Sequence, residues 1–354
     1  MLRRVEPQWV SRRINAKGRW FGRLLVDVTA EEFKASSREQ HLAAVTQGKY
    51  SLRARDGHMR NPLREPIVCG DVVHLSMHRH EPPIPLRGPP LVCHSDEQYL
   101  VVDKPCGIPV HPTGQYFHHT LVEQLRATQG PLWPCHRLDR VTSGLMIFAR
   151  TPQAASKLQR AIQRHDAVKV YLARVQGKFP GGVTLVDSPV YTLEPKRGFP
   201  AALGPSRDAS TQFELIKYDA STGQSLVQCT PRTGRTHQIR IHLARLGFPI
   251  VNDQLYNESL TKRKQYCRFV VGVPSWESLG DSRELENRIA GVLEESRTLR
   301  ENKFTGQRCP ECATPLMRDP DPAELELYLH SWKYRLAMSP DDALSFETPR
   351  PSWW

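Results

Sequence analysis

The sequence predicts an α+β protein: a mixed, largely antiparallel sheet with flanking helices, preceded by a small α+β module. The chain has 354 residues, enough for two domains with a sizeable buried core. Short apolar runs with strand-like alternation occur between stretches of helical spacing, without the regular succession of a parallel sheet. A proline-rich stretch ends a strand and forms a stiff connector, which places the domain boundary near Leu86 to Pro90.

Residues 1–88 are predicted to form an N-terminal extension and the small module. The apolar positions between Arg19 and Phe33 have roughly helical spacing, and a second short helix is expected to break at Gly48 into a strand and turn. The stretch from Cys69 to Pro85 reads as another strand that ends at the prolines. We therefore expect two helices packed with short strands.

Residues 89–338 are predicted to form the second domain, and residues 339–354 a tail. The charge-rich stretch from Asp281 to Lys303 is predicted to be an exposed helical insertion. The expected elements are strands at Tyr99–Lys104, Leu145–Ala149, Lys169–Gln176, Leu226–Thr230 and Leu325–His330, and helices at His119–Thr128, at Thr151–Arg164 and from near Thr236.

Composition narrows the class of protein. Hydrophobic residues make up 39% and charged residues 24%, and no apolar run approaches the roughly 18 residues of a membrane span, so we expect no membrane partner. A net charge of +12 with a pI of about 9.4 favours a polyanionic partner, although a solubilising surface explains the charge equally well. Nothing indicates an obligatory protein partner, so we expect a monomer.

The eight scattered cysteines do not resemble a disulfide framework, which predicts an intracellular chain with reduced thiols. The basic first twenty residues weakly resemble a mitochondrial transit peptide but are poor in serine. We expect a retained N-terminus and a cytoplasmic location, with mitochondrion and nucleus as alternatives.

Two short stretches have some features of metal sites. His78 and His80 would share one face of a strand, but no third ligand follows at a fixed spacing, which favours a structural or RNA-facing role. Cys309 and Cys312 form a CxxC pair, half of a zinc knuckle, with only His330 close in the sequence. We predict a reduced, metal-free pair and no metal site.

The stretch CHRLDRVTSGLMIFAR, from Cys135 to Arg150, concentrates the chemistry-bearing residues. Asp139 lies between Arg137 and Arg140 on a loop before an apolar strand, and neighbouring cations favour the ionised carboxylate. Such a carboxylate can be a nucleophile, a general base or a metal ligand. For an isolated aspartate, a structural ion pair is the more common explanation.

The string HRLD followed by Thr142, Ser143 and Gly144 resembles the signature of the RluA-type pseudouridine synthases. Three further stretches resemble motifs of this family: KVYLA at 169–173, RTGRTHQIRIHL at 232–243, and LYLHSWKY at 327–334, in which Ser331 replaces the usual alanine. The strings GRWFGRLL, HRHEPP and PVHPTGQYFHHTL resemble the eukaryotic branch that includes tRNA pseudouridine-32 synthases. That branch has an S4-like RNA-binding front end, so the resemblance implies an S4-like module here.

The resemblance implies an isomerase that converts uridine to pseudouridine in RNA, with tRNA as the first expectation and position 32 as its site. Ribosomal and messenger RNA are alternative substrates. Asp139 would be the indispensable catalytic residue, Tyr171 would pack against the target uracil, and Arg240 would pair with Asp139.

The chemistry is compatible with this assignment. The glycosidic bond breaks, the base rotates, and a new bond forms from C5, with no redox change, so no cofactor is expected. The carboxylate could attack C1′ or C6, or take a proton, and the sequence leaves these routes open. Arg240 would hold Asp139 ionised, and Tyr171 would stack on the base at roughly 1–3 kcal/mol.

A uridine within folded RNA must first leave its stack. Arg137 and Arg140 are suited to hold the displaced phosphates or to fill the vacated space. Arg232, Arg235 and His237 are predicted to add contacts to RNA near the same pocket.

Two other classes of function compete with this reading. A non-catalytic RNA-binding protein could retain the fold, but loss of Asp139, Tyr171 or Arg240 would then be expected, and all three are present. A zinc-dependent base-modifying hydrolase could use the CxxC pair, but the His-x-Glu and Pro-Cys-x-x-Cys arrangement of the deaminases is missing.

Overall fold

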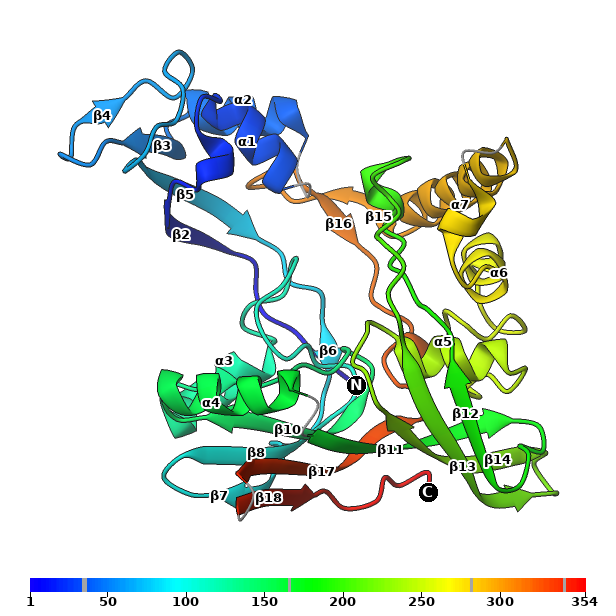
Figure 1. The fold of residues 1–354 in the computed structure, drawn as a ribbon. Coiled ribbons are helices and arrows are strands. Elements are labelled where there is room, and N and C mark those ends of the chain that lie inside the picture. The colour runs from blue at the N-terminus through cyan, green and yellow to red at the C-terminus, as the bar shows by residue number, and fades with distance from the viewer. Residues whose placement is uncertain (34–36, 165–166, 281–282, 340–341) are drawn as a thin grey trace. The chain divides into compact units, whose positions relative to one another are not determined.

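The computed structural model describes residues 1–33, 37–164, 167–280, 283–339 and 342–354 (Figure 1). The chain divides into two compact units. The small unit contains Val5–Glu81 and Phe304–Met317, and the large unit contains Met1–Arg4, Pro82–Lys303 and Arg318–Trp354. Residues 304–317 were predicted to lie in the second domain, but they fold with the small unit. Among the described helices, none is long and apolar enough to cross a membrane.

The small unit has an antiparallel sheet in the order β2-β5-β3-β4, two helices and a separate hairpin. The predicted pair of helices is confirmed, and Ser37 and Gln40 form a capping box at the start of the second. Whether the unit is S4-like stays a prediction. Its elements are β2 (Gln8–Asn15), α1 (Leu25–Glu32), α2 (Arg38–Thr46), β3 (Tyr50–Arg53), β4 (Met59–Arg60), β5 (Val72–Arg79), and the hairpin of β15 (Phe304–Arg308) and β16 (Pro315–Met317).

The large unit is built on a ten-stranded sheet in the order β12-β13-β14-β11-β17-β10-β8-β7, with β18 beside β17 and β9 beside β10 (Figure 1). The β10–β17 pair is parallel and the other strand pairs described for this sheet are antiparallel, which confirms the mixed, largely antiparallel sheet. The strands are β7 (Leu91–Ser95), β8 (Tyr99–Lys104), β9 (Trp133–Pro134), β10 (Ser143–Ala149), β11 (Ala167–Gln176), β12 (Val183–Asp187), β13 (Ser210–Asp219), β14 (Gln224–Pro231), β17 (Leu329–Ser339) and β18 (Asp342–Glu347).

Helices cover the sheet and its ends. The helices are α3 (Leu121–Gln129), α4 (Pro152–Gln163), α5 (Gln238–Arg245), α6 (Lys264–Gly272) and α7 (Arg283–Glu301), with β1 (Leu2–Arg3) and β6 (Ile84–Pro85) forming a short ribbon. Leu100 and Val102 of β8 pack in one core cluster with α3, whereas Tyr99 and Val101 pack in another with Leu158 of α4. Because successive strand residues point to opposite faces, both faces of β8 are buried. This explains its continuous apolar run.

The register of three strands brings distant motifs together. Gly144 of β10 pairs with Ser331 of β17, and Ser331 also pairs with Tyr171 of β11. A bulge between Val170 and Tyr171 interrupts β11 at this point, and bulges often re-aim a side chain next to an active site. The loop that carries Asp139 leads directly into this junction.

Three predicted elements differ from the structure. Residues 339–354 were predicted to be a tail, but they include β18, which pairs with β17 in the main sheet. The predicted strand Leu325–His330 is wrong in its first half, because a 3-10 turn at Pro322–Glu324 precedes β17, which begins at Leu329. The helix predicted at 281–303 is confirmed as α7, with its first two residues outside the described part. It is not simply exposed, because Leu285 and Ile289 are buried against α5 and α6.

Gly144 allows the close approach of β10 and β17. Its φ is +109°, and an added Cβ would lie 2.2 Å from the Ser331 carbonyl oxygen and 2.5 Å from its nitrogen. Gly144→Ala should therefore lower the free energy of unfolding by about 1–3 kcal/mol beyond the cost of the positive φ alone. The control is Gly182→Ala, whose φ is +78° with no atom within 4 Å of the added Cβ. Urea unfolding of the two variants checks this, and equal losses would contradict it.

Candidate active site

Asp139 lies on the loop before β10, with a side chain 22% exposed. Two anchors hold this loop. Leu138 is buried in the core cluster beneath it, and Lys104, at the end of β8, is fully buried. The Lys104 ammonium donates hydrogen bonds of 2.9, 2.9 and 3.1 Å to the carbonyls of Pro105, Ile108 and Arg140. The carboxylate is thus presented from a fixed backbone.

Two side chains from the start of α5 approach this carboxylate. Arg240 Nη1 lies 3.7 Å and His237 Nε2 3.5 Å from Asp139 Oδ2. His237 adopts a left-handed conformation, with φ of 57°, and its Nδ1 shares a 2.9 Å hydrogen bond with the Tyr256 hydroxyl. The predicted approach of Arg240 to Asp139 is thus present in the structure.

Asp253 fixes the orientation of Arg240. Arg240 Nε and Nη2 donate hydrogen bonds of 2.8 and 2.7 Å to the two carboxylate oxygens of Asp253, which is 1% exposed. Burial lowers the pKa of Arg240, but the charge and hydrogen bonds of Asp253, and the charge of Asp139, raise it to a net value above the usual one. Arg240 therefore stays charged, with Nη1 left to face Asp139.

Sequence analysis did not identify Asp253. No basic residue occurs between Leu246 and Thr261, so the local sequence gave no sign that this aspartate has a charged partner. The pair forms because the turn after α5 returns to the helix, with Asp253 also accepting hydrogen bonds from the backbone of Leu255 and Tyr256.

Tyr171 lines the same cavity as Asp139 from the bulged strand β11. Burial, together with the charge of Asp139 and against the opposing hydrogen bond of Ser331, raises the pKa of Tyr171 to about 12. The side chain is therefore a neutral phenol near pH 7. It can offer an aromatic face and a hydroxyl donor, but it is poorly suited to accept a proton from C5 of the base.

A cavity of about 570 Å³ joins these residues, within the roughly 300–1,000 Å³ of small-molecule sites. Of the residues predicted for the site, those that line it are Arg137, Asp139, Tyr171, Arg235, His237 and Arg240. Arg140 and Arg232 do not line it, and Arg140 Nη2 instead points to the Glu324 carbonyl at 3.4 Å. Neighbouring positions in a loop face different directions, which sequence proximity to Asp139 did not reveal.

His136 forms part of the cavity wall together with Tyr334. Their rings stack with centroids 4.8 Å apart, and His136 Nε2 accepts a 3.2 Å hydrogen bond from the Ile147 amide. Burial, with the nearby Lys169 charge, lowers the pKa of His136 to about 3. His136 is therefore neutral and supports the Asp139 loop rather than transferring protons.

Comparison with known proteins decides the family. Residues 98–245 match the family described as RNA pseudouridylate synthase. The tRNA pseudouridine(31) synthase of Saccharomyces cerevisiae is 39% identical over 391 residues, which cover 99% of this chain and 95% of that protein. This chain belongs to the RluA-type pseudouridine synthase family.

Two further relatives show the breadth of the family. The mitochondrial tRNA pseudouridine(32) synthase of the same yeast is 33% identical over 367 residues, covering 99% of this chain and 77% of that protein. Ribosomal large subunit pseudouridine synthase D of Xanthomonas campestris is 35% identical over 248 residues, covering 68% of this chain and 72% of that protein. This RluA-type synthase is an isomerase that acts on RNA.

Asp253→Asn should affect both stability and turnover of the synthase. Removing one charge of a buried pair leaves the other uncompensated, so the free energy of unfolding should fall by about 3–5 kcal/mol. Turnover should also fall with little change in RNA affinity, because Arg240 loses its orientation. The control, Asp27→Asn, removes an exposed pair with Arg38, worth at most about 1 kcal/mol. Similar losses in urea unfolding and single-turnover assays of both variants would contradict the assignment.

Lys104 should leave a pH signature in stability. Burial lowers its pKa to about 7, whereas an unfolded lysine titrates near 10.4. Between these values the unfolded chain binds more protons, so stability should rise with pH from about 7 to 10, by at most about 1.4 kcal/mol per pH unit. Urea unfolding at several pH values should show this rise in the wild type relative to Lys104→Met. A wild-type slope no steeper than that of the variant would rule it out.

Proposed function

We propose that Asp139 is the catalytic carboxylate of this synthase and that its substrate is a uridine in tRNA. One observation carries the proposal: among the described residues that line the 570 Å³ cavity, Asp139 is the single acidic one. It lies 3.7 Å from Nη1 of the Arg240 guanidinium. The other charged lining residues are cations, namely Arg137, Lys169, Arg235 and Arg240, which suit a polyanion.

The reaction needs only this carboxylate and a shaped cavity. The N1–C1′ bond breaks, the base rotates, C5 bonds to C1′, and the proton of C5 is lost while N1 gains one. Asp139 either attacks C1′ or C6, or takes a proton from the sugar, and each route requires it ionised. Tyr171 stacks on the freed uracil and keeps it in the cavity while it turns, a contact worth roughly 1–3 kcal/mol.

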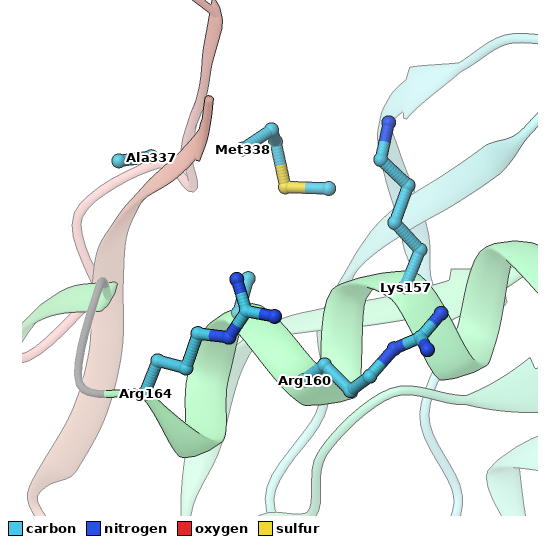
Figure 2. A pocket seen from close by; sticks show the side chains of 6 residues that line it. Lys157, Arg160, Arg164, Ala337 and Met338 are labelled. Atoms are coloured by element: carbon cyan, nitrogen blue, oxygen red, sulfur yellow. The ribbon is translucent and has the colours of Figure 1, made fainter. Parts of the chain in front are cut away.

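The RNA backbone is proposed to run along α4. This helix lines the main cavity with Gln159, Ile162 and Gln163. Its exposed basic residues Lys157, Arg160 and Arg164 line a second cavity of about 150 Å³, beside Met338 (Figure 2). Arg137 and Arg235 line the main cavity and place positive charge where a flipped nucleotide would enter, which suits the neighbouring phosphates.

The small unit, Arg232 and Arg140 are proposed to have different roles in RNA binding. The small unit is proposed to be S4-like and to add RNA contacts. Arg232 is exposed on the turn after β14 and can reach RNA outside the cavity. Arg140, held toward Glu324, is less suited to contact the flipped base and is proposed to support the loop.

The target position is proposed from the named relatives. The relative named for position 31 is 39% identical to this chain, and the match covers 95% of that relative. The relative named for position 32 is 33% identical, and the match covers 77% of that relative. This favours position 31 over the position 32 that the branch resemblance first suggested. A monomer in the cytoplasm is proposed, and the mitochondrion, named for one relative, is the alternative compartment.

Asp139→Asn tests the catalytic assignment with little change in shape. Unmodified tRNA with uridine at both positions is incubated with each protein, and pseudouridine is mapped by carbodiimide-dependent reverse-transcription stops. The wild type should produce a stop at 31, and Asp139→Asn should lower the rate by roughly 10³ or more. RNA affinity should change little, because the cationic wall remains.

The control, Asp219→Asn, alters an aspartate bonded to Ser221 and Thr222 in the turn after β13 and should keep the wild-type rate. Equal stops with wild type and Asp139→Asn would exclude Asp139 as the catalytic residue. A stop at 32 alone would correct the position, and stops in ribosomal RNA alone would correct the substrate.

A further inference from the structure

Two histidines and two cysteines meet in the small unit, whereas the residues that line the candidate active site belong to the large unit. His78 and His80 lie two positions apart at the end of β5, so their side chains leave the same face of the strand. Cys309 and Cys312 lie in the turn between β15 and β16. One ligand atom from each of the four residues lies within 4.8 Å of all the others.

The separations match a tetrahedral metal site. His80 Nε2 is 3.1 Å from His78 Nδ1 and 3.2 Å from Cys312 Sγ, and Cys309 Sγ is 3.5 Å from His78 Nδ1. Zinc bonds of about 2.0–2.1 Å to nitrogen and 2.3 Å to sulfur place neighbouring ligand atoms roughly 3.3–3.8 Å apart. These three separations lie within a few tenths of an ångström of that range, and the remaining pairs of ligand atoms lie within 4.8 Å.

We propose that His78, His80, Cys309 and Cys312 bind one structural zinc ion. A Cys₂His₂ set is a common ligand combination of structural zinc sites, and four protein ligands leave no open position for catalysis. The site is therefore distinct from that of a zinc-dependent hydrolase. It departs from the prediction of a metal-free cysteine pair, because the two stretches considered separately in the sequence meet in the structure. His330, the ligand considered for the cysteines, is instead bonded to Ser143 and Thr348 in the large unit.

The surroundings of His78 resemble the outer shell of a metal site. With Nδ1 facing the cluster, its other ring nitrogen, Nε2, is directed to Glu311, 3.5 Å away. Trp9 holds that carboxylate through a 3.0 Å hydrogen bond from Nε1 and lies against the His78 ring. A histidine ligand commonly donates its second N–H to a carboxylate, which fixes its tautomer and orientation.

The hairpin also needs an attachment that the hydrophobic core does not supply. A two-stranded hairpin is marginally stable alone. In the described part of the small unit, the core cluster built around Trp20, Leu52 and Leu75 includes no residue of β15 or β16. A zinc ion would join this hairpin to β5, two segments 231 residues apart in sequence.

A metal-free cluster is the competing explanation. A hydrogen bond between the two imidazoles accounts for one short contact, and a thiol bonded to a histidine for another. It does not account for four ligand atoms that converge on one point. Ala313, directly after the second cysteine, is in the left-handed region, with φ of 57°, and its amide donates a hydrogen bond to the Cys309 carbonyl.

The test uses full-length, tag-free protein purified without chelator. Elemental analysis should find about one zinc per chain. After exchange with cobalt(II), the protein should show the intense visible absorption of tetrahedral cobalt and a near-ultraviolet thiolate-to-cobalt band. Removal of zinc with a strong chelator should lower the midpoint of thermal unfolding and expose residues 304–317 to protease.

Variants locate the metal. The double change Cys309→Ser with Cys312→Ser, and separately His80→Asn, should abolish zinc binding. The matched control Cys69→Ser alters an exposed cysteine of the small unit and should retain about one zinc per chain. If the double variant does not fold, the cobalt spectrum of the wild type still decides whether thiolates bind.

Wild-type protein without bound zinc that also gives no thiolate-to-cobalt band would overturn the proposal, as would stoichiometric iron or retention of zinc by the cysteine variant. These readouts do not use pseudouridine formation, so failure here leaves the Asp139 proposal untouched, and the reverse also holds.

Discussion

The candidate site depends on one buried guanidinium shared between two carboxylates. Asp253 is almost fully buried and takes two of the Arg240 nitrogens, whereas Asp139 is partly exposed and faces the third from 3.7 Å. The fork to Asp253 offsets the cost of burying the cation and fixes the plane of the guanidinium. Arg240 therefore presents a rigid positive charge to Asp139 without saturating it.

The sheet supplies the second constraint, because its register places three distant motifs at one point. Ser331 of β17 pairs with both Gly144 of β10 and Tyr171 of β11. The strand β14, beside β11, ends at Pro231 and leads into the turn that carries His237 and α5. A one-residue slip in a strand would reverse the faces to which its side chains point. The close packing at Gly144 and the bulge at Tyr171 are thus parts of the site, although neither residue is charged.

The small unit illustrates a different way of using a long chain. The four-stranded sheet of this unit is formed by residues early in the sequence. The segment Phe304–Met317 also belongs to the small unit, but it follows most of the large unit in the sequence. A segment added so late has few hydrophobic contacts to hold it, and a metal ion suits this need because four short bonds replace a large buried area. In the large unit α7, at first sight a polar helix, is instead attached by a conventional apolar face that includes Leu285, Ile289 and Val292.

Local patterns in the sequence were enough for much of the fold and for the centre of the site. The strand at Tyr99–Lys104 and the helix after Thr151 follow from periodicity and capping, which act over a few residues. The HRLD string and the motifs around Tyr171 and Arg240 identified the family, since each is a contiguous stretch. Tertiary structure alone decided which partners these residues have. Asp253 reaches Arg240 through a returning turn, Arg140 faces away from the cavity, and His78 meets Cys309 across 231 residues. Such contacts depend on strand register and packing, and no local sequence pattern encodes them.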